Sequence, residues 1–383
     1  MPSYKKFLHI GLALDPIHVG AGGARLGRVE LTIVRDPVTR VPKIPGSSLA
    51  GVYRTYVAMA MHESHPNRKA RGQPWPYYPH CAGLGQPRGD YLGHCAQPDC
   101  PVCTVFGFAR GRDQAGGFAG LAAFTDAHVL LFPVPTRQGP RWITCPDALR
   151  LVGLEVQGVD QKDQKDQKDQ KDQKDQNAVY LGSNQNTHLN LGWLLLPVKV
   201  CTQFKTIADS LRNLTTPDFT ILDYVLDRLA LVSDRLFAHI VNSNLEVRTS
   251  VAINPATGAA EEQALFSYEA LPRGTVLAWE IITKNPGYFR IEGQVISAVS
   301  TPDQVHEKVK LAHPYLEHLG VGGMGTRGMG RLKVLFSDQS PSTQTVSCSA
   351  SSTSATSSPS GSSAPSAGGM TASSSGTEQG GAP

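Results

Sequence analysis

Two low-complexity stretches determine which residues can build a folded core. From Asp338 to Pro383 the chain is almost entirely Ser, Gly, Ala, Thr and Pro, and a tandem DQK tripeptide fills residues 160–176. The first composition cannot bury enough apolar surface to offset the entropy that is lost on ordering. The tripeptide period matches neither a helix nor a strand, and it would place like charges together on a helix face. We therefore expect a disordered tail over 338–383, a solvated loop over 160–176, and a core built from the rest.

The remaining sequence switches repeatedly between strand-like and helical periodicity. FLHIGLALDP and RLKVLF read as strands, whereas the residues after PGSS and those in TPDQVHEKVKLAHPYLEHLG have helical spacing. Two alternating arms around NPATG predict a β-hairpin over 247–266. Because strands and helices are interleaved without a strict βαβ rhythm, the sequence predicts an α+β fold of the ferredoxin-like kind with insertions.

The charge balance is mildly basic and permits an RNA partner. The chain has 36 Lys and Arg against 32 Asp and Glu, a net charge of +4, which becomes +7 when the two low-complexity stretches are left out. The stretch MPSYKKFLHIGLAL has too short an apolar run for a signal peptide, and no run of about eighteen apolar residues is present. We therefore expect a cytoplasmic protein without a membrane partner.

Four of the seven cysteines are clustered in a segment rich in Pro, Gly and His. The cluster consists of Cys81, Cys95, Cys100 and Cys103, the last two in a CxxC pair. This pattern favours a structural zinc site over disulfides, and ordinary reduced cysteines are the alternative. His80 and His94 compete as ligands, whereas Cys145, Cys201 and Cys348 are expected to be incidental.

A glycine-rich segment, VGGMGTRGMGR, follows the last predicted helix. Its glycines and cations suit the close approach of a backbone to a large anion. The order helix–loop–strand and the lack of a following Lys-Ser/Thr argue against a P-loop, and the same order argues against a dinucleotide-binding fingerprint. An RNA backbone and an ordinary helix-to-strand connection both remain open. The candidate RNA-binding residues here are Gly322, Gly323, Gly325, Arg327, Gly328, Gly330 and Arg331.

The helix start in PGSSLAGVYR is a second candidate phosphate site. Free N–H groups at a helix N-terminus bind phosphate, and Ser47 and Ser48 add hydroxyl groups there. Arg54 follows within about two turns. The alternative is an ordinary N-cap formed by one of the serines.

Three motifs taken together resemble the RAMP proteins of type III CRISPR-Cas effector complexes. They are RDPVTRVPKIPGSSLAGVYR, CPVCTVFG and GVGGMGTRGMGR. LAAFTDAHVLLFPVP and ALFSYEALPRGTVL narrow the resemblance to the backbone subunit of the type III-B (Cmr) complex, with the type III-A (Csm) backbone subunit as the nearest relative. The resemblance runs from about Leu8 to Phe336 in the family's order, without the DQK insertion and the tail.

The resemblance implies an RRM-like palm whose copies stack head to tail along one guide RNA. Residues 1–62 and 121–337 would form the palm, with a zinc-binding lobe inserted at 63–120 and a thumb hairpin at 247–266. The serines, Arg54 and the glycine-rich segment would contact the guide backbone, while base pairing with the target supplies the sequence readout. The implied partners are the guide (crRNA), complementary target RNA, further copies of the chain, and the large polymerase-like and small subunits of the effector.

The resemblance also implies a target-RNA endoribonuclease that requires Mg²⁺ or Mn²⁺. The family's key aspartate lies in a motif that reads roughly VDLPIxR, and this chain reads VELTIVR, so Glu30 takes its place. His18, Tyr268 and Glu269 correspond to nearby family positions. Because glutamate is one methylene longer and active sites tolerate misplacement poorly, the alternative is a structural subunit that binds RNA without cutting it. A guide-processing RAMP endoribonuclease is a third candidate, against which the zinc lobe and the PGSS motif argue.

Overall fold

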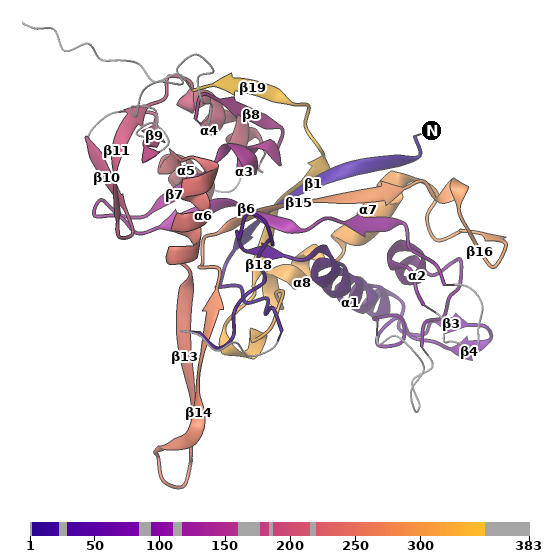
Figure 1. Cartoon of the computed structure of the whole chain (residues 1–383). Coiled ribbons are helices and arrows are strands. Elements are labelled where there is room, and N and C mark those ends of the chain that lie inside the picture. The colour runs from indigo at the N-terminus through magenta and orange to yellow at the C-terminus, as the bar shows by residue number, and fades with distance from the viewer. Residues whose placement is uncertain are drawn as a thin grey trace, which may run out of the picture. The chain divides into compact units, whose positions relative to one another are not determined.

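A mixed sheet runs through the structure, a computed structural model that describes residues 2–22, 29–83, 93–109, 117–159, 177–183, 187–214 and 220–348. Its strands within these ranges are β1 (Tyr4–Ala13), β2 (Lys43–Ile44), β5 (Ala122–Phe124), β6 (Ala127–Val134), β7 (Arg141–Thr144), β9 (Val179–Leu181), β10 (His188–Leu191), β11 (Leu194–Val200), β12 (Leu229–Leu231), β15 (Val276–Lys284) and β18 (Leu332–Gln339). Their order is β10–β11–β9–β12–β7–β6–β15–β1–β18, with β2 paired to β6 and β5 paired to β15 (Figure 1).

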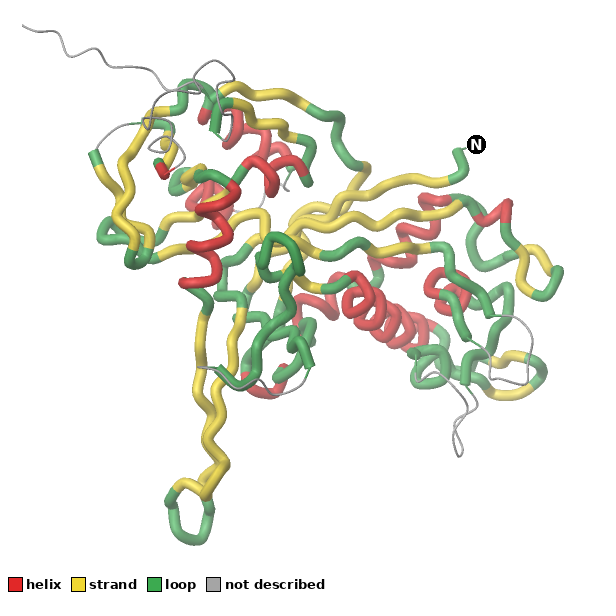
Figure 2. Tube along the Cα trace, in the orientation of Figure 1, coloured by secondary structure: helices red, strands yellow, loops and turns green. Residues whose placement is uncertain are grey.

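The neighbouring strands β6, β15, β1 and β18 are antiparallel and lie against helices. Strand β1 is buried along most of its length because its residues from Phe7 to Ala13 are mainly apolar. The register places Phe7 opposite Ile281 on β15 and Ile10 opposite Phe336 on β18. Three helices pack beside these strands or on one another, α1 (Gly46–Ser64), α7 (Pro302–Lys310) and α8 (His313–His318) (Figure 2). No helix within the described ranges has both the length and the apolar composition needed to cross a lipid bilayer.

Helix α1 begins slightly before the serines at which the sequence placed its start. Pro45 is the N-cap residue, and no side chain of its own caps the helix. Instead the backbone N–H of Gly46 donates a 2.8 Å hydrogen bond to Oδ1 of Asp126, whose other oxygen lies 2.7 Å from Lys43 Nζ. A carboxylate at this position satisfies a free N–H group and stabilises the helix dipole. The predicted serine N-cap is therefore wrong, because a carboxylate distant in sequence fills that role.

Residues 141–243 surround the other end of the sheet. Strands β9 and β11 are parallel there, with Val179 opposite Val198, and β12 is parallel to β7. The helices are α3 (Pro146–Arg150), α4 (Phe204–Asn213), α5 (Thr220–Leu226) and α6 (Asp234–Ser243). Helix α4 is amphipathic and buries Phe204, Ile207 and Leu211. The apolar side chains of this region therefore extend the hydrophobic core of the sheet.

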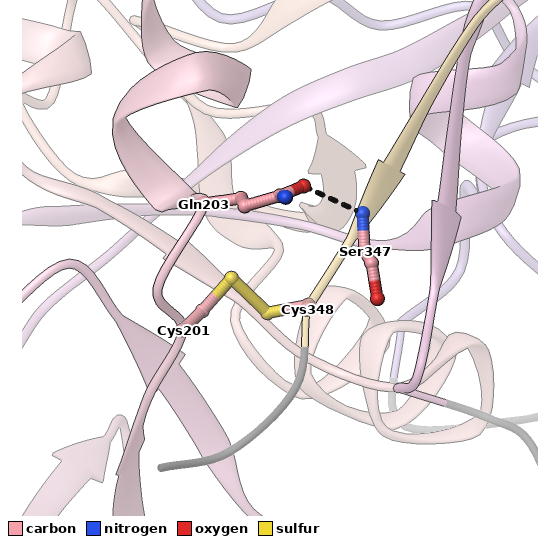
Figure 3. The surroundings of a disulfide bond; sticks show 4 residues. All are labelled: Cys201, Gln203, Ser347 and Cys348. Carbon is pink, nitrogen blue, oxygen red and sulfur yellow. Dashed lines mark hydrogen bonds between the residues drawn. A yellow bond between two sulfur atoms is a disulfide. The ribbon is translucent and has the colours of Figure 1, made fainter.

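The C-terminal part of the described chain differs from the predicted tail. Strand β18 continues to Gln339, and β19 (Gln344–Ser347) pairs in parallel with β8 (Leu154–Gln157). Cys348 then forms a disulfide with Cys201, with Cα atoms 5.0 Å apart, and Gln203 Oε1 accepts a hydrogen bond from the N–H of Ser347 (Figure 3). The tail therefore cannot begin at Asp338, and two cysteines expected to be incidental are joined. Residues 349–383 and the DQK stretch at 160–176 lie outside the described ranges.

A long antiparallel hairpin projects from the sheet, as the sequence predicted (Figure 1). It consists of β13 (Glu246–Ile253) and β14 (Ala260–Ala270), and it extends four residues beyond the predicted end at Phe266. Its apolar side chains Val247, Val251, Ile253 and Leu265 are exposed. The remaining small elements are β3 (Lys69–Ala70), β4 (Gln73–Pro74), α2 (Pro101–Phe106), η2 (Pro286–Tyr288), β16 (Arg290–Ile291), β17 (Gln294–Val295) and η3 (Gly325–Arg327).

Three histidines meet where α7 and α8 lie against β1 and β18. His9 is fully buried, and its Nε2 lies 3.3 Å from Nε2 of His306. Ser337 Oγ lies 3.0 and 3.1 Å from these two nitrogens. The ring of His313 lies 5.5 Å from that of His9. Burial, followed by the electrostatic effect of neighbouring histidines or of Lys310, lowers the pKa of His9, lowers that of His306 to about 4 and lowers that of His313 to about 3.

This cluster predicts a loss of stability in mild acid. The unfolded chain takes up protons on these histidines near pH 6.5, whereas the folded chain does so only at lower pH. The free energy of unfolding is therefore unaffected by these neutral histidines above pH 6.5. It decreases as the pH falls from 6.5 toward about 4, because protonation favours the unfolded chain. We expect the thermal unfolding midpoint to fall by several degrees between pH 7 and pH 5, and His306→Gln to flatten that dependence. His188→Gln, at an exposed position on β10, is the matched control; an equal slope in both variants would contradict the prediction.

Candidate RNA interface and metal centre

Four thiols converge in the lobe that follows α1. Cys81, Cys95, Cys100 and Cys103 are buried, and their sulfur atoms lie within 4.8 Å of one another. The Cys95–Cys103 and Cys81–Cys100 sulfur separations are 3.7 and 4.0 Å. A tetrahedron with Zn–S bonds of about 2.3 Å has edges of about 3.8 Å, so the donor set and its spacing fit. The cluster could hold a metal ion such as zinc, with every coordination position supplied by protein.

The two histidines that competed as ligands have other contacts. His94 Nδ1 lies 2.9 Å from Nη2 of Arg54, and burial followed by this cation lowers its pKa to about 4. The His80 ring packs against Trp75. Arg68 instead approaches the thiols, with Nη2 3.4 Å from Cys95 Sγ. Its positive charge stabilises thiolate at that sulfur.

The glycine-rich segment is folded back against the residues that follow β1. The N–H of Gly323 donates to the carbonyl of His18, and the N–H of Gly330 donates to that of Pro16, both at 2.9 Å. Gly322 has φ +89°, and a Cβ atom there would lie 2.3 Å from the His18 carbonyl oxygen. Glycine is therefore required at Gly322 by a left-handed conformation and a close backbone contact. Gly325 differs, because the nearest atom to a Cβ there would be 3.9 Å away.

A small apolar cluster anchors this segment on the root of the hairpin. Its buried members are Tyr268, Ala270 and Met329, and Leu31, Phe266 and Met324 pack against them. The two methionines that alternate with the glycines thus fix the segment to the base of the hairpin. Above it, the Arg327 guanidinium lies 5.2 Å from the centre of the Phe266 ring, within cation–π range. The segment therefore presents Gly322, Gly323, Gly325, Arg327 and Gly328 to solvent, whereas Gly330 is buried and Met324 and Met329 pack against the hairpin root.

The strand-like residues around Glu30 add a third segment to the hairpin root. Leu31 forms a parallel bridge with Tyr268, in which its N–H donates to Ser267 O at 3.1 Å and its carbonyl accepts from Glu269 N at 3.0 Å. The N–H of Glu30 lies 3.3 Å from Ser267 Oγ. The Glu30 residue is exposed. Its carboxylate is therefore available to a ligand in solution while its backbone is fixed.

The other three catalytic candidates are close to Glu30 but already engaged. Glu269 Oε2 accepts from Arg35 Nη2 at 2.8 Å and from the N–H of Ile33 at 3.4 Å. His18 is buried, and its Nδ1 lies 2.6 Å from the Glu269 carbonyl oxygen. Tyr268 is buried against the edge of the His18 ring. These contacts position the backbone around Glu30 and leave little of these side chains for a ligand.

The predicted cationic RNA contacts fall into two groups. Arg331 forms a two-point ion pair with Asp15 and thereby lowers the pKa of that carboxyl group. Arg54 donates to the Cys81 carbonyl at 2.9 Å as well as contacting His94, so its known contacts lie in the metal lobe. Arg327 is exposed beside the glycines. Only the last of the three faces solvent without a carboxylate partner within the described ranges.

A hydrogen bond joins helix α1 to the residue that directly precedes the glycine-rich segment. Tyr56 Oη donates a 2.6 Å hydrogen bond to the carbonyl of Gly320, and its ring stacks on that of Tyr315. Ser47 is exposed and Ser48 is half-buried in the first turn of the same helix. The two predicted phosphate contacts are therefore carried by elements that touch, although no side-chain contact between the serines and the glycines is present in the described ranges.

Sequence reasoning missed residues whose role is to hold the site. Arg35 ends the VELTIVR motif, and it also donates from Nε to Asn242 Oδ1 at 2.9 Å, which joins the Glu30 segment to α6. Asp15 lies two residues after β1 and pairs with Arg331. The alternation of Met324 and Met329 with glycine was a visible signal, whereas the partners of Arg35 and Asp15 lie more than two hundred residues away.

Comparison with known proteins identifies the family of the chain. Residues 12–333 match the RAMP superfamily. The chain is 24% identical over 336 residues to the CRISPR system Cmr endoribonuclease Cmr4 of Pyrococcus furiosus, a match that covers 86% of this chain and 95% of that one. It is 30% identical over 110 residues to the CRISPR system Cms endoribonuclease Csm3 of Methanothermobacter thermautotrophicus, which covers 29% of this chain and 32% of that relative.

Solved structures show the same fold. A chain of the type III-B Cmr-beta complex bound to cognate target RNA superposes with a TM-score of 0.54 at 15% identity, over 87% of this chain and 98% of that one. A crystal structure of Cmr4 gives a TM-score of 0.50 at 16% identity, over 88% of this chain and all of that one. Because the family match spans most of the folded residues, the chain belongs to the RAMP superfamily.

Proposed function

We propose that the chain is a backbone subunit of a type III CRISPR effector complex that coats a guide RNA. The observation that carries this proposal is the surface at the hairpin root, where Leu31, next to the exposed Glu30, and the methionines of the glycine-rich segment pack on one apolar cluster, with Arg327 over the Phe266 ring. The relative with the longest match, named as a Cmr endoribonuclease, supports the same assignment. The proposed partners are the guide RNA, complementary target RNA, further copies of the chain, and the large and small effector subunits.

The connectivity supports a ferredoxin-like palm with a thumb. The chain passes through β1, α1, β6, β15, the α7–α8 pair and β18, and the strands are ordered β6–β15–β1–β18. A βαββαβ path of this kind is the ferredoxin-like pattern. We assign the thumb to β13 and β14, whose exposed valine, isoleucine and leucine side chains suit contact with unstacked bases. The metal lobe, for which we propose zinc, is inserted between α1 and β5.

The proposed guide contact uses backbone more than side chains. A phosphate can approach Gly323 and Gly325 closely because both are exposed and lack a side chain. Arg327 supplies a charge at the same surface, and Ser47 and Ser48 supply donors at the start of α1. Arg331 joins this set if phosphate replaces Asp15 as its partner. Such contacts read no sequence, so specificity comes from guide–target pairing.

We further propose that Glu30 is the residue on which target cleavage depends. In this chemistry the ribose 2′-hydroxyl gives up its proton to solvent as its oxygen attacks the adjacent phosphorus, the bond from phosphorus to the 5′-oxygen breaks, and the leaving oxygen takes a proton from solvent, which yields a 2′,3′-cyclic phosphate and a 5′-hydroxyl. An exposed carboxylate can orient the 2′-hydroxyl or hold Mg²⁺ or Mn²⁺, which would offset charge on the phosphate. His18, Tyr268 and Glu269 hold the backbone that carries it. The competing reading is a structural subunit whose longer glutamate binds without cutting.

The test of RNA binding compares two glycines in one loop. Gly325→Val is expected to weaken guide-driven assembly at least tenfold at an unchanged thermal midpoint, because its Cβ would lie no closer than 3.9 Å to a protein atom while the side chain would meet the RNA. Gly322→Ala is expected to lower the midpoint itself, because its Cβ would overlap the His18 carbonyl. The measurements are light scattering with a single-stranded guide RNA and thermal unfolding without RNA. Wild-type assembly by Gly325→Val would show that the loop does not face RNA.

A further inference from the structure

We propose that a cavity beside Arg141 binds a phosphate-bearing ligand of about mononucleotide size, at a site separate from the proposed RNA interface. The inference does not depend on the proposed function. The cavity measures about 380 Å³, and its polar lining includes Arg141, Ser183, Thr202, Lys205 and Asp227. None of these residues belongs to the hairpin root, the glycine-rich segment or α1. The volume lies within the ~300–1,000 Å³ range typical of small-molecule sites.

The position of the cavity follows from the parallel strands. Strands β9 and β11 run side by side and end at Leu181 and Val200. The next residues, Gly182 with Ser183 and Cys201 with Thr202, line the cavity. A crevice just beyond the carboxyl ends of parallel strands is the place where open α/β sheets bind ligands. The second of these loops is held by the Cys201–Cys348 disulfide and by the hydrogen bond from Ser347 N to Gln203 (Figure 3).

The charge of Arg141 is the observation that points to an anion. The residue is half-buried, and its guanidinium has no hydrogen bond or ion pair to any residue in the described ranges. Its pKa is lowered, first by burial and then by repulsion from Arg228. Within the described ranges, no carboxylate raises it. A guanidinium that is partly removed from water without a partner destabilises the fold, and an anion in the cavity would remove that cost.

The other charges around the cavity do not neutralise Arg141. Asp227 lines the cavity but forms no ion pair with Arg141. Its negative charge instead helps to raise the pKa of Arg212. Arg228 lies over the Tyr224 ring at 3.7 Å and donates to the Tyr224 carbonyl. Lys205 adds a second cation on the first turn of α4. Two cations with the hydroxyls of Ser183 and Thr202 suit a phosphate, and Asp227 limits the site to ligands that place their charge away from it.

The experiment measures thermal unfolding of the full chain against ligand concentration. The probes are inorganic phosphate, AMP and a single-stranded RNA dodecamer. The variants are Arg141→Met and, as a matched control, Arg150→Met on α3, where the arginine is exposed and paired with Asp147. Wild type and Arg150→Met are expected to gain stability with AMP, whereas Arg141→Met loses at least tenfold in affinity. Without ligand, Arg141→Met is expected to unfold at the same or a higher temperature, because the unpaired charge is gone.

Each outcome bears on the assignment. A gain with AMP or phosphate that Arg141→Met abolishes supports a free phosphate compound, and a variant-dependent gain confined to the dodecamer supports an RNA phosphodiester. Lys205→Met, at an exposed position, gives the same test with a weaker expected effect if Arg141→Met does not fold. No difference between wild type and these variants with any probe would overturn the proposal. A lower ligand-free midpoint for folded Arg141→Met would also overturn it, because Arg141 would then be structural. None of these readouts requires guide binding or cleavage.

Discussion

Cys103→Ser is expected to release bound zinc and to lower the thermal midpoint of the chain more than any other single change considered. The four thiols are buried and close enough for one tetrahedral ion, so loss of one ligand leaves an incomplete site in the interior. Losses of this kind exceed about 4 kcal/mol, which corresponds to roughly 8–16 °C at 2–4 °C per kcal/mol. The damage should spread, because α2 carries Cys103 and packs against both α1 and α7.

The control for this prediction is the remaining free cysteine. Cys145 is buried but lies outside the cluster, so Cys145→Ser should keep a full equivalent of zinc and most of the stability. Metal content by inductively coupled plasma mass spectrometry and the unfolding midpoint with and without a chelator are the measurements. Well-folded wild type that contains no metal would remove the zinc assignment, and so would full metal content in Cys103→Ser.

Glu30→Ala is expected to abolish regularly spaced cleavage of target RNA by the assembled, guide-loaded complex in Mg²⁺ or Mn²⁺. Removal of a group that orients the nucleophile or its metal costs roughly 10²–10⁴-fold in rate. Guide binding should be unchanged, because the Glu30 side chain is exposed and its backbone bonds remain. Single-turnover cleavage of a labelled target is the measurement. Glu261→Ala, at another exposed glutamate on β14, is the matched control and should cut like wild type.

Glu30→Asp distinguishes the two readings of this site. If wild type cuts, Glu30→Asp reports how far the catalytic geometry depends on the extra methylene. If wild type does not cut and Glu30→Asp does, the chain is a structural subunit whose site lost its geometry by one carbon. Regular cuts that persist in Glu30→Ala would show that cleavage depends on another residue.

The sequence predicted those parts of the fold that local pattern controls. The hairpin at β13 and β14 follows from strict alternation around NPATG, and α1 follows from apolar residues at helical spacing. The four-cysteine cluster was also predictable, because its ligands lie within a short segment and their spacing is distinctive. By contrast, β19 could not be predicted, because QTVS lies in a Ser- and Thr-rich stretch and is ordered by pairing with distant β8 and by the Cys201 disulfide.

The catalytic roles of the four candidate residues stay a prediction. The structure shows only where they lie: Leu31, next to Glu30, bridges Tyr268, and His18 Nδ1 lies 2.6 Å from the Glu269 carbonyl oxygen. Sequence position could not reveal that Glu269 is held by Arg35, or that Arg331 is held by Asp15, because ion pairs depend on tertiary contact. The same limit explains the cap of α1, where Asp126 replaces the expected serine.

The hydrogen bonds at the hairpin root link β14 directly to the segment that carries Glu30. The two strands project from their root at Tyr268 and Glu269. At this root the Leu31 segment is bonded to β14 by backbone hydrogen bonds and by the Arg35–Glu269 ion pair. A displacement of β14 at Tyr268 and Glu269 would therefore move the Leu31 segment, and with it the backbone of the neighbouring Glu30. A ligand that bends the hairpin as far as its root would thus move the Glu30 backbone at the same time.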